Sequence, residues 1–311
     1  VFVPRLCKGL NFARLMAGYA DSGHEAIALI AALLSVELGR GHVCVELAAV
    51  DGKPFAGLES PLAPRLDAAQ LRAALVAEAR LCAGPASTAP LPLVLDGDRV
   101  YLHRYWAGEG RVAARLRALA TRPVAAAPDA RALLDRLYPD EAAGSAGQKL
   151  ACAMALTRAL GVISGGPGTG KTTTVARLLV MLAAAAAAEG RSLAIRLAAP
   201  TGKAAARVGE ALAREVAALA RGGQVAPQLL AQLPTSAQTL HRLLGAGSRG
   251  LRHDAANPLA ADVVVLDESS MVDLRLLDAL LAALPRHARL LLLGDRDQLA
   301  AVEAGNVFGA L

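Results

Sequence analysis

The stretch "GGPGTGKTTT" at residues 165–174 decides the fold of this 311-residue chain. Residues 165–172 fit the pattern G-x-x-x-x-G-K-[ST], which follows a short apolar segment and opens a long helical one. Glycines let the backbone curl so that successive N–H groups face an anion, and the helix start adds partial positive charge. The stretch therefore predicts a P-loop, the loop that wraps the phosphates of a nucleotide.

The types of residue in this loop predict separate roles in binding ATP and Mg²⁺. Lys171 is expected to bridge the β- and γ-phosphates, and the Thr172 hydroxyl is expected to hold Mg²⁺. The remaining nucleotide contacts are expected from Gly165, Gly166, Pro167, Gly168, Thr169, Gly170 and Thr173.

Around the loop, four apolar segments alternate with helical stretches. The segments lie at 161–164, 193–199, 262–266 and 289–293. This alternation predicts an α/β fold with a parallel sheet covered on both faces. A polar turn follows each segment, and the carboxyl ends of parallel strands line one edge of a sheet. We therefore expect the four turns to meet at one site.

The turn in "VVVLDES" (263–269) delivers two carboxylates at the end of a buried strand. Asp267 is expected to hold Mg²⁺, directly or through water. Glu268 is expected to orient and deprotonate an attacking water, which favours hydrolysis over phosphate transfer to a substrate. In "LLLLGDRDQLAAVEAG" (290–305), Gln298 is placed to contact the γ-phosphate or that water.

Two further turns leave alternatives open when judged from the residues alone. "AAPTGKAAARV" (198–208) places Thr201 and Lys203 at a helix start, which suits a nucleic-acid backbone. An ordinary strand–helix turn with a solvated lysine explains the same pattern. "SAQTLHRLLG" (236–245) equally allows a plain helix start with His241 facing the core.

The rest of the chain indicates a separate N-terminal domain. Residues 1–122 are mostly helix-like, with a hairpin predicted over 91–106 around "DGD", and residues 123–311 form the P-loop domain. A proline-containing linker is expected at 121–130. No apolar run reaches the roughly 18 residues of a membrane span. The four scattered cysteines favour reduced thiols in a cytoplasmic protein, and the net charge of +6 suits a polyanionic partner.

Taken together, the motifs resemble the first motifs of superfamily 1 DNA helicases, and most of all the RecD family, the alpha subunit of exodeoxyribonuclease V. The resemblance rests on "GGPGTGKTTT", "APTGKAAAR", "TLHRLLG", "VVVLDESSMVD" and "LLGDRDQLAAVEAG". It extends to "FARLMAGYADSG", "GHVCVEL" and "LHRYWAGE" in the N-terminal region. It implies a RecA-like domain in a motor that moves 5′→3′ on single-stranded DNA during double-strand break repair and recombination. The implied partners are DNA, single-stranded or at duplex ends, and the beta and gamma subunits of a heterotrimer.

The resemblance also assigns residues. "SAGQKLACAMAL" (145–156) looks like a helicase Q motif, in which Gln148 would read the adenine edge. Lys171, Glu268 and Gln298 fall on positions for hydrolysis. The positions implied to touch the DNA backbone are Pro200, Thr201, Lys203, Thr239 and His241.

The sequence departs from the family pattern in stopping soon after the third motif set, so the second RecA-like domain is absent from it. We expect this stretch alone to bind nucleotide weakly and to hydrolyse it slowly or not at all, because that domain supplies an arginine to the γ-phosphate. Two alternatives are a stand-alone RecD-like helicase and an ATP-binding structural subunit without motor activity. No metal-carboxylate nuclease pattern is evident in the sequence.

Overall fold

The computed structural model describes residues 2–55, 65–124, 127, 129–139, 145–166, 168–295, 304–305 and 307–310. The chain forms two compact units. The first consists of residues up to Arg111 with short later segments that include Asp273–Arg275, and the second contains most of the rest. The division falls inside helix α5 (His103–Thr121), whereas the sequence places the domain boundary at residue 122, where this helix ends. Part of the predicted linker, at 125, 126 and 128, lies outside the described residues.

The first unit combines helices with a small sheet. Its helices before α5 are α1 (Phe2–Tyr19), α2 (His24–Gly39), α3 (Leu47–Val50) and α4 (Ala68–Ala77). Its strands are β1 (Cys44–Glu46), β2 (Cys82–Ala83), β3 (Leu93–Asp96) and β4 (Arg99–Leu102), in the order β1-β4-β3-β2. The predicted hairpin is confirmed as β3 and β4, whose tight turn contains Gly97 at a φ of 59°. The second strand is shorter than expected, because α5 already begins at His103.

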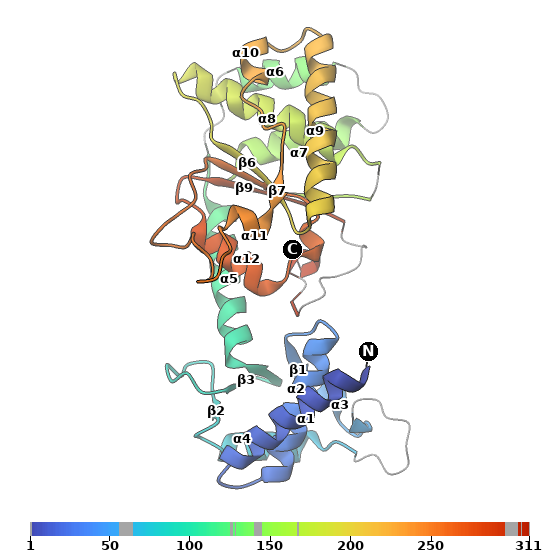
Figure 1. The fold of residues 1–311 in the computed structure, drawn as a ribbon, viewed down its shortest axis with the longest axis vertical. Coiled ribbons are helices and arrows are strands. Elements are labelled where there is room, and N and C mark those ends of the chain that lie inside the picture. The colour runs from blue at the N-terminus through green and yellow to red at the C-terminus, as the bar shows by residue number, and fades with distance from the viewer. Residues whose placement is uncertain are drawn as a thin grey trace. The chain divides into compact units, whose positions relative to one another are not determined.

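The second unit contains the predicted parallel sheet (Figure 1). Its strands are β5 (Leu160–Ser164), β6 (Ile195–Ala199), β7 (Gln238–Thr239), β8 (Val263–Leu266) and β9 (Arg289–Gly294), in the order β5-β9-β8-β6-β7. All the pairings in this sheet are parallel. The four strands predicted from apolar segments are confirmed, and β7 is an additional strand of two residues.

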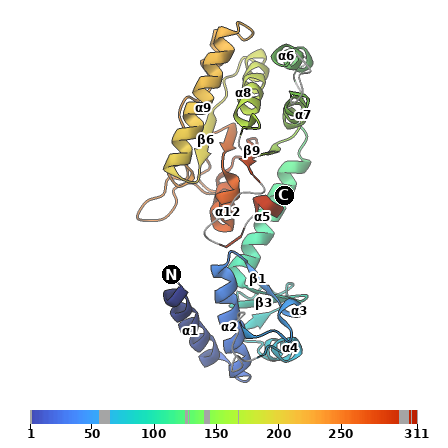
Figure 2. The same cartoon turned by 90° about the vertical axis from the view of Figure 1, so that its right-hand side faces the viewer.

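Helices cover both faces of this sheet (Figures 1 and 2). They are α6 (Ala130–Leu137), α7 (Ser145–Leu156), α8 (Lys171–Ala188), α9 (Gly202–Arg221), α10 (Pro227–Leu230), α11 (Leu240–Leu243) and α12 (Leu274–Ala283), with 3₁₀ turns η2 (Ser269–Met271) and η3 (Phe308–Ala310). Helix α8 packs beside both α7 and α9, whereas α12 lies on the other side of the strands in Figure 1.

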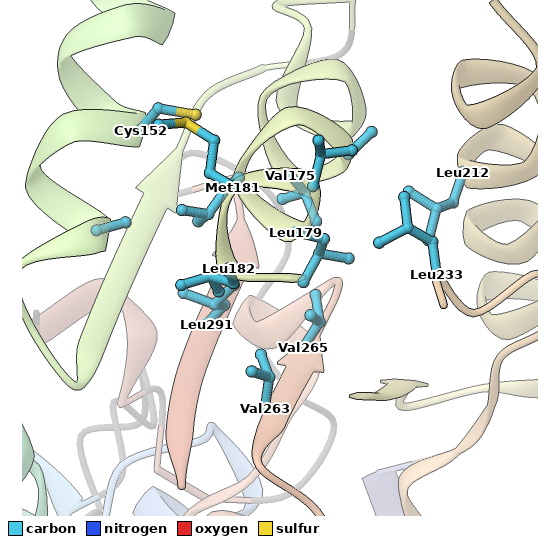
Figure 3. Packing of buried hydrophobic residues seen from close by; sticks show 14 of the residues in the cluster. Cys152, Val175, Leu179, Met181, Leu182, Leu212, Leu233, Val263, Val265 and Leu291 are labelled. Carbon is cyan, nitrogen blue, oxygen red and sulfur yellow. The ribbon is translucent and has the colours of Figure 1, made fainter. Parts of the chain in front are cut away.

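The core of the second unit lies between α8 and the sheet (Figure 3). Leu179 and Leu182 of α8 pack with Val265 of β8 and Leu291 of β9, all of them buried. Burial of each such side chain contributes about 1.5–3 kcal/mol. Helix α8 has the length and apolar composition of a membrane span, but more than half of it is buried inside the protein. Its apolar character is therefore that of a core helix.

Candidate nucleotide-binding site

The predicted P-loop connects β5 to the start of α8. Gly168 and Gly170 have φ values of 77° and 81°, a left-handed conformation that side chains other than glycine rarely adopt. A Cβ atom at Gly170 would also lie 2.3 Å from Nε2 of Gln148, and one at Gly165 would lie 2.6 Å from Oγ1 of Thr169. The loop is therefore a narrow cradle that needs glycine at these positions. Pro167 lies outside the described residues.

The side chain of Lys171 folds back over this loop. Its Nζ donates hydrogen bonds to the carbonyl oxygens of Gly165 and Gly166, the second at 3.1 Å. Thr169 Oγ1 donates to the same Gly166 oxygen at 2.9 Å. The ammonium group thus lies at the cradle, where it can exchange carbonyl oxygens for phosphate oxygens.

The acidic turn after β8 brings Asp267 and Glu268 to the same edge of the sheet. Burial raises the pKa of the Asp267 carboxyl, while a hydrogen bond from Glu268 N and the positive charge of Lys171 act in the opposite direction. That hydrogen bond to Asp267 Oδ1 measures 2.8 Å. The P-loop and the acidic turn follow β5 and β8, which both pair in parallel with β9, so the two turns lie at the same edge of the sheet.

Glu268 has an unusual backbone. Its φ is 49°, and no other non-glycine residue in the described part of the chain has a positive φ. The next residue anchors the turn, because Ser269 Oγ lies 2.8 Å from the carbonyl oxygens of Leu266 and Leu293. Strain of this kind is concentrated at functional sites, where the surrounding structure holds it in place.

The turn after β9 also reaches the P-loop. Gly165 N donates to the carbonyl oxygen of Gly294 at 3.2 Å, and a Cβ atom built at Gly166 would lie 3.8 Å from Asp295 Oδ2. Gln298, predicted as the contact to the γ-phosphate or to the attacking water, lies outside the described residues. Its role stays a prediction.

Gln148 lies against the P-loop, as the Q-motif resemblance implies. Helix α7 carries it, and its Nε2 donates to the carbonyl oxygen of Thr169 at 3.1 Å. The side chain is thus held beside the nucleotide loop, and its contact with adenine stays a prediction.

The residues suit ATP with Mg²⁺. The cradle matches a chain of phosphates, and the Thr172 hydroxyl and Asp267 carboxylate are oxygen ligands at its side. Within the described ranges no group of three or more His, Cys, Asp or Glu residues could hold a metal ion by itself. Mg²⁺ fits such a site, because it is bound by one or two carboxylates plus phosphate oxygens and water.

The residues predicted to touch DNA lie at the ends of the adjacent strands β6 and β7. Thr201 and Thr239 cap α9 and α11, where their hydroxyls accept hydrogen bonds from Ala204 N and Arg242 N. Pro200 is half-buried just before the first cap. The side chains of Lys203 and His241 are exposed, so His241 does not face the core. The start of α9 thus presents a lysine to solvent, and the start of α11 a histidine.

Sequence reasoning missed a set of arginines on α11 and on the turn that follows it. Arg242 follows His241 on α11, and Arg249 and Arg252 lie on the next turn; all three are exposed. An antiparallel bridge between Gly247 and Gly250 shapes this turn, and Arg252 N donates back to Leu244 O at 3.0 Å. The Gly- and Arg-rich stretch "GAGSRGLR" (245–252) directly after "TLHRLL" was the available signal.

Comparison with known proteins agrees with this site. A family model described as an AAA domain matches residues 148–304, and the model for the N-terminal domain of "RecBCD enzyme subunit RecD" matches residues 9–101.

Three curated relatives illustrate the extent of the similarity. RecBCD enzyme subunit RecD of Mycolicibacterium smegmatis is 43% identical over 97% of this chain and 51% of its own length. The Haemophilus influenzae protein of the same name is 38% identical over 71% of the chain and 35% of its length. The ATP-dependent RecD2 DNA helicase of Deinococcus radiodurans is 37% identical over 67% of the chain and 25% of its length. The chain thus spans about half the length of the Mycolicibacterium relative and less of the others. On its motifs, its fold and these matches, it belongs to the RecD family.

Proposed function

We propose that the chain is part of an ATP-dependent 5′→3′ DNA helicase, the RecD-type subunit of an exodeoxyribonuclease V complex in double-strand break repair and recombination. The observation that carries this proposal is the convergence of two strand ends, those of β5 and β8, on one site. The P-loop lysine Lys171, the half-buried carboxylate of Asp267 and the strained Glu268 meet at the carboxyl edge of a parallel sheet. That arrangement suits hydrolysis of a nucleoside triphosphate and energy transfer to moving parts.

The chain's own residues divide the work at this site. Lys171 exchanges the carbonyl oxygens of Gly165 and Gly166 for the β- and γ-phosphates. Thr172 and Asp267 hold Mg²⁺, which when bound neutralises charge that develops on the phosphates. Glu268 orients the attacking water and accepts its proton at the carboxylate. Gln298 is proposed to contact the γ-phosphate, and Gln148 the adenine edge.

The neighbouring helix starts are proposed to track the DNA backbone. Thr201 and Thr239 place the first N–H groups of α9 and α11 at the ends of two paired strands, where they suit phosphate oxygens. The exposed side chains of Lys203, at the start of α9, and of Arg252, on the turn after α11, add positive charge nearby. The net charge of +6 agrees with a polyanionic partner.

The first unit is proposed to dock on partner subunits, the beta and gamma subunits of a heterotrimer. Large apolar side chains are exposed on its helices, namely Leu10, Leu15 and Tyr19 on α1 and Val76 on α4. Such side chains suit an interface that removes them from water. We place the complex in the cytoplasm, and the cysteines Cys44, Cys82 and Cys152 are free thiols as that location requires.

Two observations favour this function over the alternatives. The match to the RecD N-terminal domain at residues 9–101 favours a complex subunit over a stand-alone helicase. The half-buried carboxylate of Asp267 and the strained Glu268 favour hydrolysis over a purely structural nucleotide site.

The decisive experiment measures ATP hydrolysis by the full-length protein, alone and with its partner subunits, with and without single-stranded DNA. We expect DNA to stimulate hydrolysis, and Lys171→Ala to abolish it. Glu268→Gln is expected to keep ATP bound while turnover falls by about 10²-fold or more. A full-length protein that binds ATP but is never stimulated by DNA, even in the complex, contradicts the helicase function and supports a structural nucleotide site.

A further inference from the structure

A hydrogen-bonded chain inside the second unit links α7 to the P-loop helix. We propose that Tyr138 and Cys152 are positioning residues for adenine recognition, and that they hold α7 in register with α8 so that Gln148 stays against the P-loop. The inference rests on the proposed function, in which ATP binds at the loop and Gln148 contacts its base.

The link consists of three groups in a row. The hydroxyl of Tyr138 lies 3.5 Å from Cys152 Sγ, and the thiol donates to the carbonyl oxygen of Thr174 at 3.4 Å. Because the carbonyl oxygen only accepts, the thiol proton points to Thr174, and the Tyr138 hydroxyl donates to sulfur. Burial raises the pKa of Cys152 to about 11 and also raises the pKa of Tyr138, so both groups keep their protons at neutral pH.

The link ends at the same loop that Gln148 touches. Thr174 lies in the first turn of α8, and its Oγ1 donates to Gly170 O at 3.0 Å. Gly170 in turn packs against the Gln148 amide, which donates to Thr169 O. Gln148 and Cys152 are four residues apart on α7, so they share one face of the helix. Two contacts on that face therefore fix α7 against the loop and helix α8, and Figure 3 shows Cys152 directed toward α8.

The surroundings make the link specific. Cys152 is fully buried and Tyr138 is 3% exposed, among apolar neighbours in the core. The Arg177 guanidinium of α8 lies over the Tyr138 ring, with its Cζ 4.3 Å from the ring centre, and this fixes the ring from a second side. The ion pair of Lys149 with Asp135 and the hydrogen bond from Arg289 to Leu156 O also hold α7, but they join it to α6 and β9. The link is therefore the polar contact that fixes the position of α7 along α8. A slide of one residue, about 1.5 Å, breaks the contact between Gln148 and Thr169 O.

The test measures base discrimination, which a merely structural role does not change. Dissociation constants of the full-length protein for ATP and GTP are obtained by competition with a fluorescent ATP analogue. The measured quantity is the ratio of the GTP constant to the ATP constant. We expect Tyr138→Phe and Cys152→Ala to lower this ratio roughly threefold to tenfold, the value of one hydrogen bond, with GTP affinity unchanged.

Two further variants separate the link from packing. Cys152→Ser keeps a donor and an acceptor at this position and is expected to retain the preference for ATP. Cys82→Ala removes another buried thiol, in the first unit, and is expected to leave the ratio unchanged. Tyr138→Phe removes a single oxygen atom, so this variant tests the link by itself if Cys152→Ala does not fold.

The outcomes distinguish this inference from the function on which it rests. An unchanged ratio in Tyr138→Phe, with a lowered ratio in Gln148→Ala, overturns the link and leaves the proposed function standing. A wild-type protein that binds no ATP, or a Gln148→Ala variant with the wild-type ratio, overturns base recognition by Gln148 and the link with it.

Discussion

A single residue, Glu268, combines a proposed catalytic role with backbone strain. The left-handed region costs a residue with a Cβ atom roughly 1 kcal/mol or more, and glutamate has no short side chain to offset this. The turn is held by neighbours on both sides, namely Asp267 through Glu268 N and Ser269 through two carbonyl oxygens. The proposed role of Glu268 in hydrolysis gives a reason for this strain to be retained.

We therefore predict that Glu268→Asn raises the stability of the protein and lowers its ATPase activity. Asparagine enters the left-handed region more easily than glutamate, so the free energy of unfolding is expected to rise by up to about 1 kcal/mol. Hydrolysis by the full-length protein is expected to fall by about 10²-fold or more, because the shorter amide accepts no proton. Denaturant unfolding measures the free energy of unfolding, and an ATPase assay measures the rate of hydrolysis. A variant less stable than the wild type shows that the backbone is unstrained.

No pattern in the sequence predicts this conformation, whereas the motif does predict a role in hydrolysis for Glu268, and that role stays a prediction. Motif spacing fixes which residue types follow each strand, and Lys171, Asp267 and Gln148 lie near the loop as expected. The φ of Glu268 depends instead on contacts that Ser269 makes with β9, a strand 20 residues further along the chain. Such non-local contacts leave no local signature.

At the scale of elements, Ser269 joins the ends of two strands. Its buried hydroxyl lies within hydrogen-bond distance of Leu266 O on β8 and Leu293 O on β9. We predict that Ser269→Ala lowers the free energy of unfolding by about 1–2 kcal/mol, because a buried carbonyl oxygen loses its donor. The measurement is denaturant unfolding.

Ser270 provides the matched control. Its hydroxyl is equally buried, but it has no hydrogen-bond partner among the described residues. Ser270→Ala is expected to leave stability unchanged or to raise it, since the substitution removes an unsatisfied polar group. Equal losses in the two variants would show that packing, and not the Ser269 link, stabilises this turn.

In the first unit, Glu78 ties the turn between α1 and α2 to the end of α4. Its carboxylate accepts hydrogen bonds from Asp21 N at 3.0 Å, Ser22 N at 2.5 Å and Ser22 Oγ at 2.8 Å. These donors, led by Asp21 N, lower the pKa of Glu78 below its usual 4.5. A lowered pKa means that the stabilisation is complete above pH 4.5 and is lost as the pH falls through the lowered value.

We predict that Glu78→Gln is less stable than the wild type at pH 7, and that this difference shrinks as the pH falls below 4.5. The amide carries no charge, so its hydrogen bonds do not depend on pH in this range. Unfolding of both proteins is followed at a series of pH values from neutral to acidic. A difference that stays constant over the series contradicts the role of the charged carboxylate.

Sequence patterns are sufficient to predict the strands that consist of apolar residues. Strands β8 and β9 are continuous apolar runs with both faces buried, and the sequence predicted them within one residue. Strand β7 contains only the polar residues Gln238 and Thr239, which are extended because they pair with Ala198 and Ala199 of β6. Two polar residues carry no periodicity, so only the tertiary pairing defines this strand.

At the scale of the whole molecule, the excess of positive charge has a consequence for binding. Of the charged residues, 33 are Lys or Arg and 27 are Asp or Glu. A small excess of this kind does not by itself define a nucleic-acid surface, and the sequence alone left the two helix-start turns undecided. The structure places the cations of Lys203, Arg249 and Arg252 at exposed positions that follow β6 and β7 along the chain. The position of these cations, more than their number, supports DNA binding.

This placement predicts the salt dependence of DNA binding by the full-length protein. Each phosphate contact to single-stranded DNA adds about 0.7 to the slope of log affinity against log salt concentration. Lys203→Ala and Arg252→Ala are each expected to reduce the slope by about that amount, and the double variant by about twice as much. Arg221→Ala is the control, because it removes an exposed cation at the far end of α9, about 27 Å along the helix from Lys203. An equal reduction in all three single variants would mean that DNA affinity depends only on net charge, whereas a loss confined to Lys203 and Arg252 locates the DNA strand at the start of α9 and the turn after α11.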